Sequence, residues 1–134
     1  MRRREEIKQG IVGKWVHKAE IDLGVAEYLL QEGSAFPSVI AFHCQQAAEK
    51  YLKAFLARHE VEFPKTHDLE EILDLVAVIN AELATSLRAV EVLTPFGVEI
   101  RYPGDRPDAM PEEARVAVAL AQRVRDAILP RLQA

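Results

Sequence analysis

Apolar residues recur along much of the chain at the three- and four-residue spacing that is typical of α-helices. The first run predicts a helix from about Glu5 to Gln31, which ends before Gly33 and Ser34. The second begins at Pro37, a residue suited to the first turn of a helix, and fades before Pro64. The apolar face of this second helix contains Ile40, Cys44, Ala47, Ala48, Tyr51, Leu52 and Phe55.

Three more helices are predicted in the second half of the chain. Asp68 stands three residues before Glu71, so the pair predicts a capping box at the start of a short helix. A fourth helix should end at residues 94–95, because the residue before Pro95 is disfavoured in helical geometry. A fifth opens at Pro111 and runs to about Leu132. With no strand pattern visible, the prediction is an all-α, antiparallel up-and-down bundle of about five helices.

A long irregular segment, PFGVEIRYPGDRPDAM, separates the fourth and fifth helices. Its prolines and glycines exclude a regular helix, and loops of this length are usually functional or disordered. Alternating apolar residues favour an ordered loop that packs partly in extended form on the bundle: Phe96, Val98, Ile100 and Tyr102. Within it, Arg101 could bind phosphate or brace the loop, and Tyr102 could stack on a base or pack on the core.

Composition restricts the class of protein. A length of 134 residues without an obvious linker predicts one domain over residues 1–134, and 49% hydrophobic with 28% charged residues is typical of a soluble globular fold. The single cysteine, Cys44, fits a reducing cytoplasm, and no run approaches the ~18 apolar residues of a membrane span. A net charge of −4 means that any phosphate site must be a local basic patch. No cofactor or metal site is expected.

The second helix carries a polar stripe beside its apolar face. His43, Gln46, Lys50 and Lys53 fall on one side of a helix. Such a stripe is either a solvated surface or a strip that binds phosphate oxygens through the lysines, with His43 and Gln46 as additional hydrogen-bonding groups. The spacing leaves both interpretations open.

A mixed seam lies between these two sides of the second helix, and it combines large apolar groups with an amide and a carboxylate. Such a seam suits contact with a second protein surface, so we expect an interface, in a homodimer, at Phe42, Gln45, Glu49, Leu52 and Leu56.

Three stretches of the sequence resemble the HEPN family (higher eukaryotes and prokaryotes nucleotide binding). They are AFHCQQAAEKYLKAFL, FPKTHDLEEIL and RYPGD, in the family's order, and the resemblance covers roughly Lys14 to Arg131. It implies a helical bundle that tends to dimerise and is often encoded beside a minimal nucleotidyltransferase. Its relatives either bind nucleotide or cleave RNA as toxins.

The family's ribonucleases use an Arg-x4-6-His motif, in which a guanidinium stabilises charge on the phosphate and an imidazole moves protons. Arg101 is the candidate arginine, but no histidine follows it, since all four histidines precede it: His17, His43, His59 and His67. The motif is therefore absent. His43 or His67 could still supply the imidazole in space, although His67 is also placed to order the start of the third helix.

The resemblance, taken with the residue pattern, thus implies a cytoplasmic HEPN-domain protein that binds nucleotide or RNA phosphate and works with a minimal nucleotidyltransferase in a two-component or toxin-antitoxin pair. The ligand would lie near Lys50, Lys53 and Arg101. Two alternatives remain: a metal-independent ribonuclease that uses Arg101 and His43, and a non-catalytic assembly subunit.

Overall fold

The structure is a computed structural model that describes residues 2–33, 36–97 and 108–133; within them it contains helices and no strand. The all-α prediction is therefore confirmed. In chain order the elements are α1 (Arg2–Gln31), α2 (Pro37–Arg58), α3 (Leu69–Ile79), α4 (Ala81–Leu87), the 3-10 helix η1 (Arg88–Gly97), α5 (Pro111–Ile128) and the 3-10 helix η2 (Leu129–Leu132).

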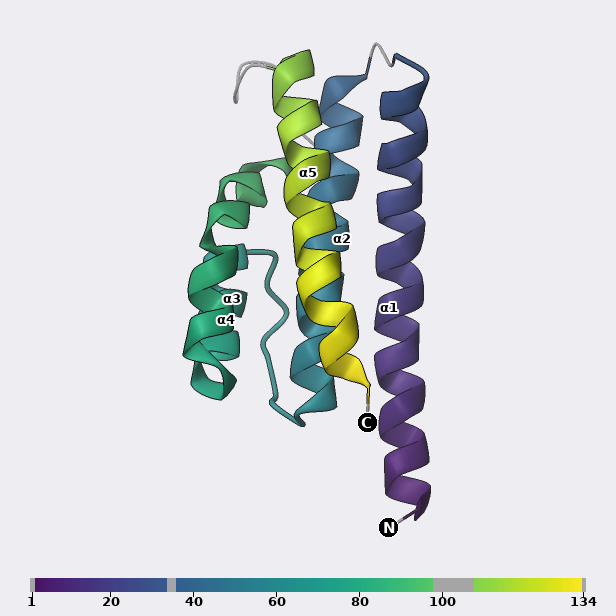
Figure 1. Cartoon of the computed structure of the whole chain (residues 1–134), viewed down its shortest axis with the longest axis vertical. Coiled ribbons are helices and arrows are strands. Elements are labelled where there is room, and N and C mark those ends of the chain that lie inside the picture. The colour runs from purple at the N-terminus through teal and green to yellow at the C-terminus, as the bar shows by residue number, and fades with distance from the viewer. Residues whose placement is uncertain (1, 34–35, 98–107, 134) are drawn as a thin grey trace.

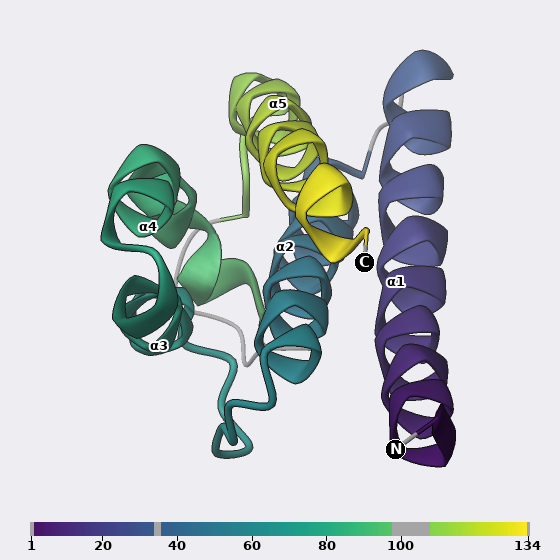
Figure 2. The ribbon, with the colours of Figure 1, turned by 60° about the horizontal axis from the view of Figure 1, so that its bottom comes forward.

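Three long helices form the body of the bundle, and α3 and α4 lie together beside it (Figure 1). The chain runs up α1 and down α2, so these two helices are antiparallel. It also runs down α5, in the same direction as α2 (Figures 1 and 2). In the chain, α3, α4 and η1 come between α2 and α5. Helices α3 and α4 lie to one side of α2 (Figure 1).

Helix α2 is the centre of the fold. It packs against α1, α3, α5, η1 and η2, whereas the helices on which α1 packs are α2 and α5 (Figure 2). Because neighbours surround α2, its buried residues lie on nearly every side: Ile40, Ala41, Cys44, Gln45, Ala47, Ala48, Glu49, Tyr51, Leu52, Lys53, Ala54, Phe55 and Leu56. Several polar side chains of α2 are therefore buried within the single chain.

The start of α3 agrees with the predicted cap but not with the predicted capping box. The Asp68 carboxylate accepts from the backbone N–H of Glu70 (3.0 Å), as an N-cap should. Glu71, however, accepts from the Thr66 hydroxyl (2.9 Å), and that hydroxyl oxygen accepts from the Asp68 N–H (3.1 Å). The Asp68 N–H, which would donate to the Glu71 carboxylate in a capping box, thus donates to the Thr66 hydroxyl instead.

The fourth helix is shorter than predicted. α4 ends at Leu87, and the chain continues as a 3-10 helix that includes Pro95. Proline has no backbone N–H to donate in either type of helix, so η1 lacks one hydrogen bond at Pro95. Thr94 on η1 accepts from the backbone N–H of Leu69 (3.1 Å), which joins η1 to the start of α3. The predicted ordered packing of Val98, Ile100 and Tyr102 lies outside the described residues.

Candidate functional site

The predicted dimer seam on α2 is wrong for four of its five residues. Gln45, Leu52 and Leu56 are fully buried, and Glu49 is 3% exposed, all inside one chain. Only Phe42 is half-buried. The prediction failed because it assumed that part of α2 stays uncovered, whereas α3 and η1 also pack on this helix.

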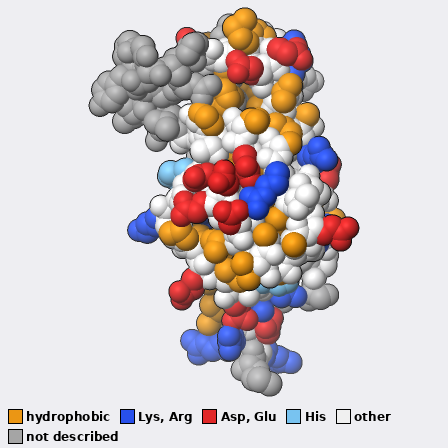
Figure 3. Space-filling view, turned by 90° about the vertical axis from the view of Figure 1, so that its left-hand side faces the viewer, with side chains coloured by type: hydrophobic (Ala, Val, Ile, Leu, Met, Phe, Trp, Pro, Cys, Tyr) orange, Lys and Arg blue, Asp and Glu red, His pale blue; other side chains and the backbone are white. Residues whose placement is uncertain are grey.

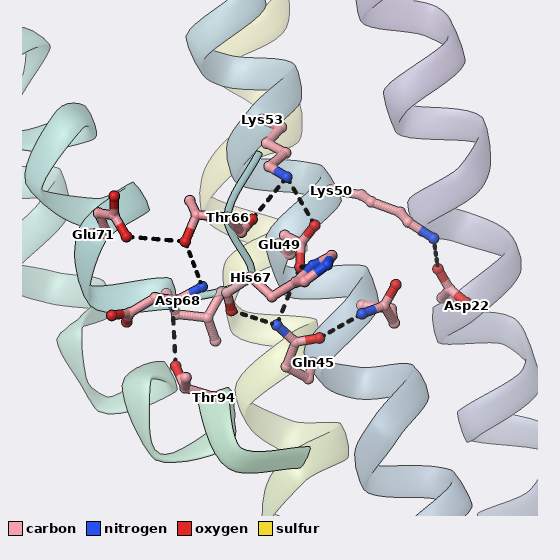
Figure 4. A network of polar contacts seen from close by, with 12 residues as sticks. Asp22, Gln45, Glu49, Lys50, Lys53, Thr66, His67, Asp68, Glu71 and Thr94 are labelled. Atoms are coloured by element: carbon pink, nitrogen blue, oxygen red, sulfur yellow. Dashed lines mark hydrogen bonds and ion pairs between the residues drawn. The ribbon is translucent and has the colours of Figure 1, made fainter. Parts of the chain in front are cut away.

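Lys53 is not a free cation. Its side chain is 6% exposed, and its ammonium donates to Glu49 Oε2 (2.9 Å) and to the backbone carbonyl of Thr66 (3.0 Å). The ammonium also lies 5.6 Å from the ring centroid of Trp15 and 5.5 Å from that of Phe63. All these contacts satisfy the charge internally, so the prediction that Lys53 holds a phosphate is corrected: the residue ties α2 to the segment before α3 (Figure 4).

Glu49 is the centre of a polar cluster that reaches the surface at one residue. Its Oε1 accepts from His67 Nδ1 (2.8 Å) and from the Gln45 amide (3.2 Å), and the same amide donates to the backbone carbonyl of His67 (2.9 Å) (Figure 4). Gln46 donates to Gln45 Oε1 (2.7 Å). The Glu49 side chain is 4% exposed and that of His67 is 68% exposed. His67 therefore presents its ring to solvent while a buried carboxylate holds it from behind.

A second cluster of the same design lies between α1 and α2. Asp22 accepts from His43 Nδ1 through Oδ1 (2.9 Å) and from the Lys50 ammonium through Oδ2 (2.5 Å). Asp22 is 8% exposed, and the side chains of His43 and Lys50 are 25% and 20% exposed. Lys50 points towards α1, away from Lys53 (Figure 4), so the two lysines do not form the predicted cationic strip.

The two clusters share one chemical arrangement. In each, a buried carboxylate accepts from a histidine Nδ1 and from a lysine ammonium. An ionised carboxylate can only accept, so Nδ1 carries the proton and Nε2 is the nitrogen left for a ligand. A neutral imidazole can accept a proton at Nε2, and a charged imidazole can donate a hydrogen bond from Nε2 to an anion. Because each lysine is paired, the imidazoles of His43 and His67 are the groups that remain available.

Gly97 borders the His67 cluster. A Cβ at this position would lie 2.6 Å from Gln45 Cδ, and hydrogen bonds already hold the Gln45 side chain. The backbone of η1 therefore approaches Gln45 as closely as only glycine permits. The predicted ligand residues Arg101 and Tyr102 follow in the sequence but lie outside the described residues.

The surface over α3 and α4 is acidic. Figure 3 shows carboxylates gathered on this face, and the exposed acidic residues of these helices are Glu70, Glu71, Asp74 and Glu82. Arg88 is held there by Asp74 (2.9 Å) and Glu91 (2.8 Å). Such a face repels phosphate, so a nucleotide or RNA would have to bind elsewhere.

The Cys44 thiol and the Tyr51 phenol are both enclosed. Burial raises the pKa of the Cys44 thiol to about 12, with a smaller contribution from Glu27, so Cys44 is no nucleophile at neutral pH. Burial likewise raises the pKa of Tyr51 to about 12. Among the described residues no group of three His, Cys, Asp or Glu side chains could hold a metal ion, and no helix is long and apolar enough to cross a membrane.

The sequence reasoning missed Asp22 and Thr66. The signal for Asp22 was available, because this carboxylate falls on the same side of α1 as the buried Ala19 and Ala26. A charged residue on an apolar face needs a partner. Thr66 gave no signal, since its role is set by a backbone carbonyl that accepts from Lys53.

Comparison with known proteins agrees with this fold. The HEPN domain model matches residues 12–132. Two similar solved structures are ST0689, an archaeal HEPN homologue, and TT1696 from Thermus thermophilus. The first is 23% identical with a TM-score of 0.66, the second 27% identical with a TM-score of 0.65, and each match covers 91% of this chain and 98% of the other. No match was found among curated proteins. The family match spans most of the described helices, and the chain therefore belongs to the HEPN domain family.

Proposed function

We propose that this HEPN-domain protein binds the phosphate of a nucleotide or of RNA at the exposed edge of the His67 cluster, and that it works with a minimal nucleotidyltransferase in a two-component or toxin-antitoxin pair. His67 supplies the contact on the bundle, and Arg101 and Tyr102 supply contacts from the following loop. Lys53 supports the site from behind, as the partner of Glu49.

The observation that carries this proposal is the placement of His67. Its ring is exposed, its Nδ1 is fixed by a buried carboxylate 2.8 Å away, and its backbone carbonyl is held by Gln45. A ring oriented in this way loses little freedom when it binds a ligand. An exposed side chain that is held in place by hydrogen bonds to buried residues is typical of a functional site.

Arg101 completes the proposed site because the cluster itself carries little net charge. The Lys53 and Glu49 charges cancel, so anion binding needs a further cation. A guanidinium is the side chain best suited to hold phosphate oxygens through paired hydrogen bonds. The backbone of Gly97 lies against Gln45, and Gly97 is four residues before Arg101 in the sequence.

Titration of the purified protein with fluorescent nucleotides and a short RNA tests the proposal. We expect saturable binding that weakens with salt, as phosphate contacts do. His67→Ala and Arg101→Ala should each weaken binding about tenfold, the loss expected for one charge-assisted contact.

Two exposed residues that make no polar side-chain contact within the described chain, His17 and Arg123, serve as matched controls. His17→Ala and Arg123→Ala should leave binding unchanged. Equal losses in the control variants, or no saturable binding at all, would contradict the nucleotide proposal and favour the alternative of a non-catalytic assembly subunit.

A metal-independent ribonuclease is the second candidate, because His43 and His67 each present Nε2 in the way that a general base requires. Incubation of structured RNA with the protein in EDTA tests this activity. Cleavage that is lost in Arg101→Ala and in one histidine variant would establish the ribonuclease and identify its imidazole.

The partnership has its own test. Co-expression with a small nucleotidyltransferase from a neighbouring reading frame, if one is encoded there, should yield a complex of defined stoichiometry in sedimentation. Two proteins that migrate separately at micromolar concentration would contradict this part of the proposal, without bearing on nucleotide binding.

A further inference from the structure

Helix α1 has an uncovered side with the spacing of a coiled-coil seam. Seven successive positions, four and three residues apart, share this side: Ile7, Ile11, Lys14, Lys18, Ile21, Val25 and Tyr28. We call them the α1 stripe. Its large apolar members are unusually exposed, with Ile7 at 55%, Ile11 at 46%, Ile21 at 53% and Tyr28 at 62%. A repeat of 3.5 residues is the pattern by which one helix packs along another.

The described part of the chain leaves the α1 stripe exposed except at Val25, which is half-buried. α1 lies at the edge of the bundle, with α2 and α5 on one side of it only (Figures 1 and 2). The residues that are buried by these neighbours lie on another side of the helix, which borders the stripe at Asp22: Val12, Ala19, Asp22, Leu23 and Ala26. The apolar residues of the stripe are therefore not needed for the packing of α1 on the bundle.

The charges of the stripe have one sign. Lys14 and Lys18 occupy its centre, between a pair of isoleucines on one side and Ile21 with Val25 on the other. Both lysines are exposed, and neither makes a hydrogen bond or ion pair within the described residues. No carboxylate belongs to the stripe, so its centre is complementary to acidic side chains.

Two glycines flank the stripe at positions where no contact within this chain requires a glycine. Gly10 and Gly24 are exposed, interior helical residues, and a Cβ at either would meet no atom within 4 Å. Glycine inside a helix destabilises it relative to alanine. Since no internal contact needs them, these positions leave room for a second backbone to approach from outside.

The stripe is also continuous with a groove at its N-terminal end. This groove has a volume of about 290 Å³ and lies between the start of α1 and the end of α2. Ile7 and Ile11 of the stripe form one wall, and Ala57 and Val61 contribute to the other. A hollow of this size accepts a large apolar side chain from a docked helix.

We propose that the α1 stripe binds an amphipathic helix of a partner protein, with carboxylates opposite Lys14 and Lys18 and apolar side chains opposite the flanking hydrophobic residues. A second copy of this chain is a poorer occupant. Antiparallel pairing of two α1 helices centred between the two lysines would set Lys14 against Lys18, and parallel pairing in register would set each lysine against itself. The inference does not depend on the proposed nucleotide site.

Binding of designed peptides to the full chain tests this surface. The probe is a synthetic helix of about four heptads with leucine at its a and d positions, except for glutamate at the two central ones. The matched control peptide has lysine at these two positions. We expect the glutamate peptide to bind at least about tenfold more tightly than the lysine peptide, because two ion pairs replace two like-charge contacts.

Variants locate the contact. Lys14→Glu combined with Lys18→Glu should reverse the preference between the two peptides. Gly24→Ala should raise the melting temperature of the isolated protein by about 3 °C yet weaken binding of the glutamate peptide several-fold. Glu20→Ala, at an exposed position outside the stripe, should leave the affinity unchanged.

Failure of both peptides to bind would overturn the proposal, and so would equal binding of the two. A Gly24→Ala variant that binds the glutamate peptide as tightly as the unmodified protein would remove the argument for close backbone approach. A dimer in sedimentation that Ile21→Glu converts to monomer would assign the stripe to a second copy and refute the acidic partner.

Discussion

Replacing Lys53 by methionine removes an ammonium group from a position where Glu49 depends on it. The two side chains are 6% and 4% exposed, and their charged atoms lie 2.9 Å apart. Methionine keeps much of the volume of the lysine stem and its packing near the ring of Trp15. The change therefore isolates the loss of the charge rather than of the apolar contact.

The size of the effect follows from the carboxylate left behind. Removing one partner of a buried ion pair costs about 3–5 kcal/mol, because the other charge stays in a medium of low polarity. His67 and Gln45 still donate to Glu49, so we expect the lower part of this range, about 3 kcal/mol. For a chain of this length the corresponding fall in melting temperature is about 9 °C.

Urea unfolding followed by circular dichroism at 222 nm measures this loss. Lys53→Met combined with Glu49→Gln should recover about half of it, since no net charge is then buried. Lys65→Met serves as the control, because Lys65 is exposed and its ammonium makes no polar contact within the described chain, and it should change stability by less than about 0.5 kcal/mol. A Lys53→Met variant as stable as this control would show that the buried pair is not formed as described.

Three further results are expected. Gly97→Ala should destabilise the protein by about 1–3 kcal/mol in urea unfolding, because its Cβ would overlap Gln45, whereas Gly10→Ala, which meets no atom, should stabilise it slightly. Unfolding free energy should fall between about pH 9 and pH 12, because the native state keeps the Cys44 proton over this range while the unfolded chain releases it. Cys44→Ala should lessen that slope in unfolding at alkaline pH, and an unchanged slope would contradict the burial argument. Asp68→Ala should cost about 1 kcal/mol in thermal unfolding through loss of the α3 cap, whereas Asp68→Asn should retain most of it.

The spacing of apolar residues was sufficient to predict that the chain forms helices, but it did not predict how these helices are arranged. Pro37 and Pro111 mark the first residues of α2 and α5, because a proline fits the first turn and the missing N–H costs nothing there. The predicted continuation of the fourth helix to Thr94 was wrong, since local spacing does not distinguish an α-helix from the 3-10 helix that follows Leu87.

The candidate site was harder to predict because its contacts join distant parts of the chain. Asp22 accepts from His43, which is 21 residues away, and Lys53 donates to the backbone of Thr66. A helical wheel groups the polar residues of α2 on one side, but it cannot show that carboxylates neutralise both Lys50 and Lys53. The wheel identified the residues of interest and misjudged which of them remain available to a ligand.

The central position of α2 also determines how the molecule opens. The central turns of α2 are enclosed by α1, α3, α5 and η1, so we expect their backbone amides to exchange hydrogen with water mainly through global unfolding. The first turns of α1 have neighbours on one side only, and their amides can exchange through local fraying. The end of α1 that carries Ile7 and Ile11 can therefore adjust its shape to a docked helix at little energetic cost, while the centre of the molecule stays closed.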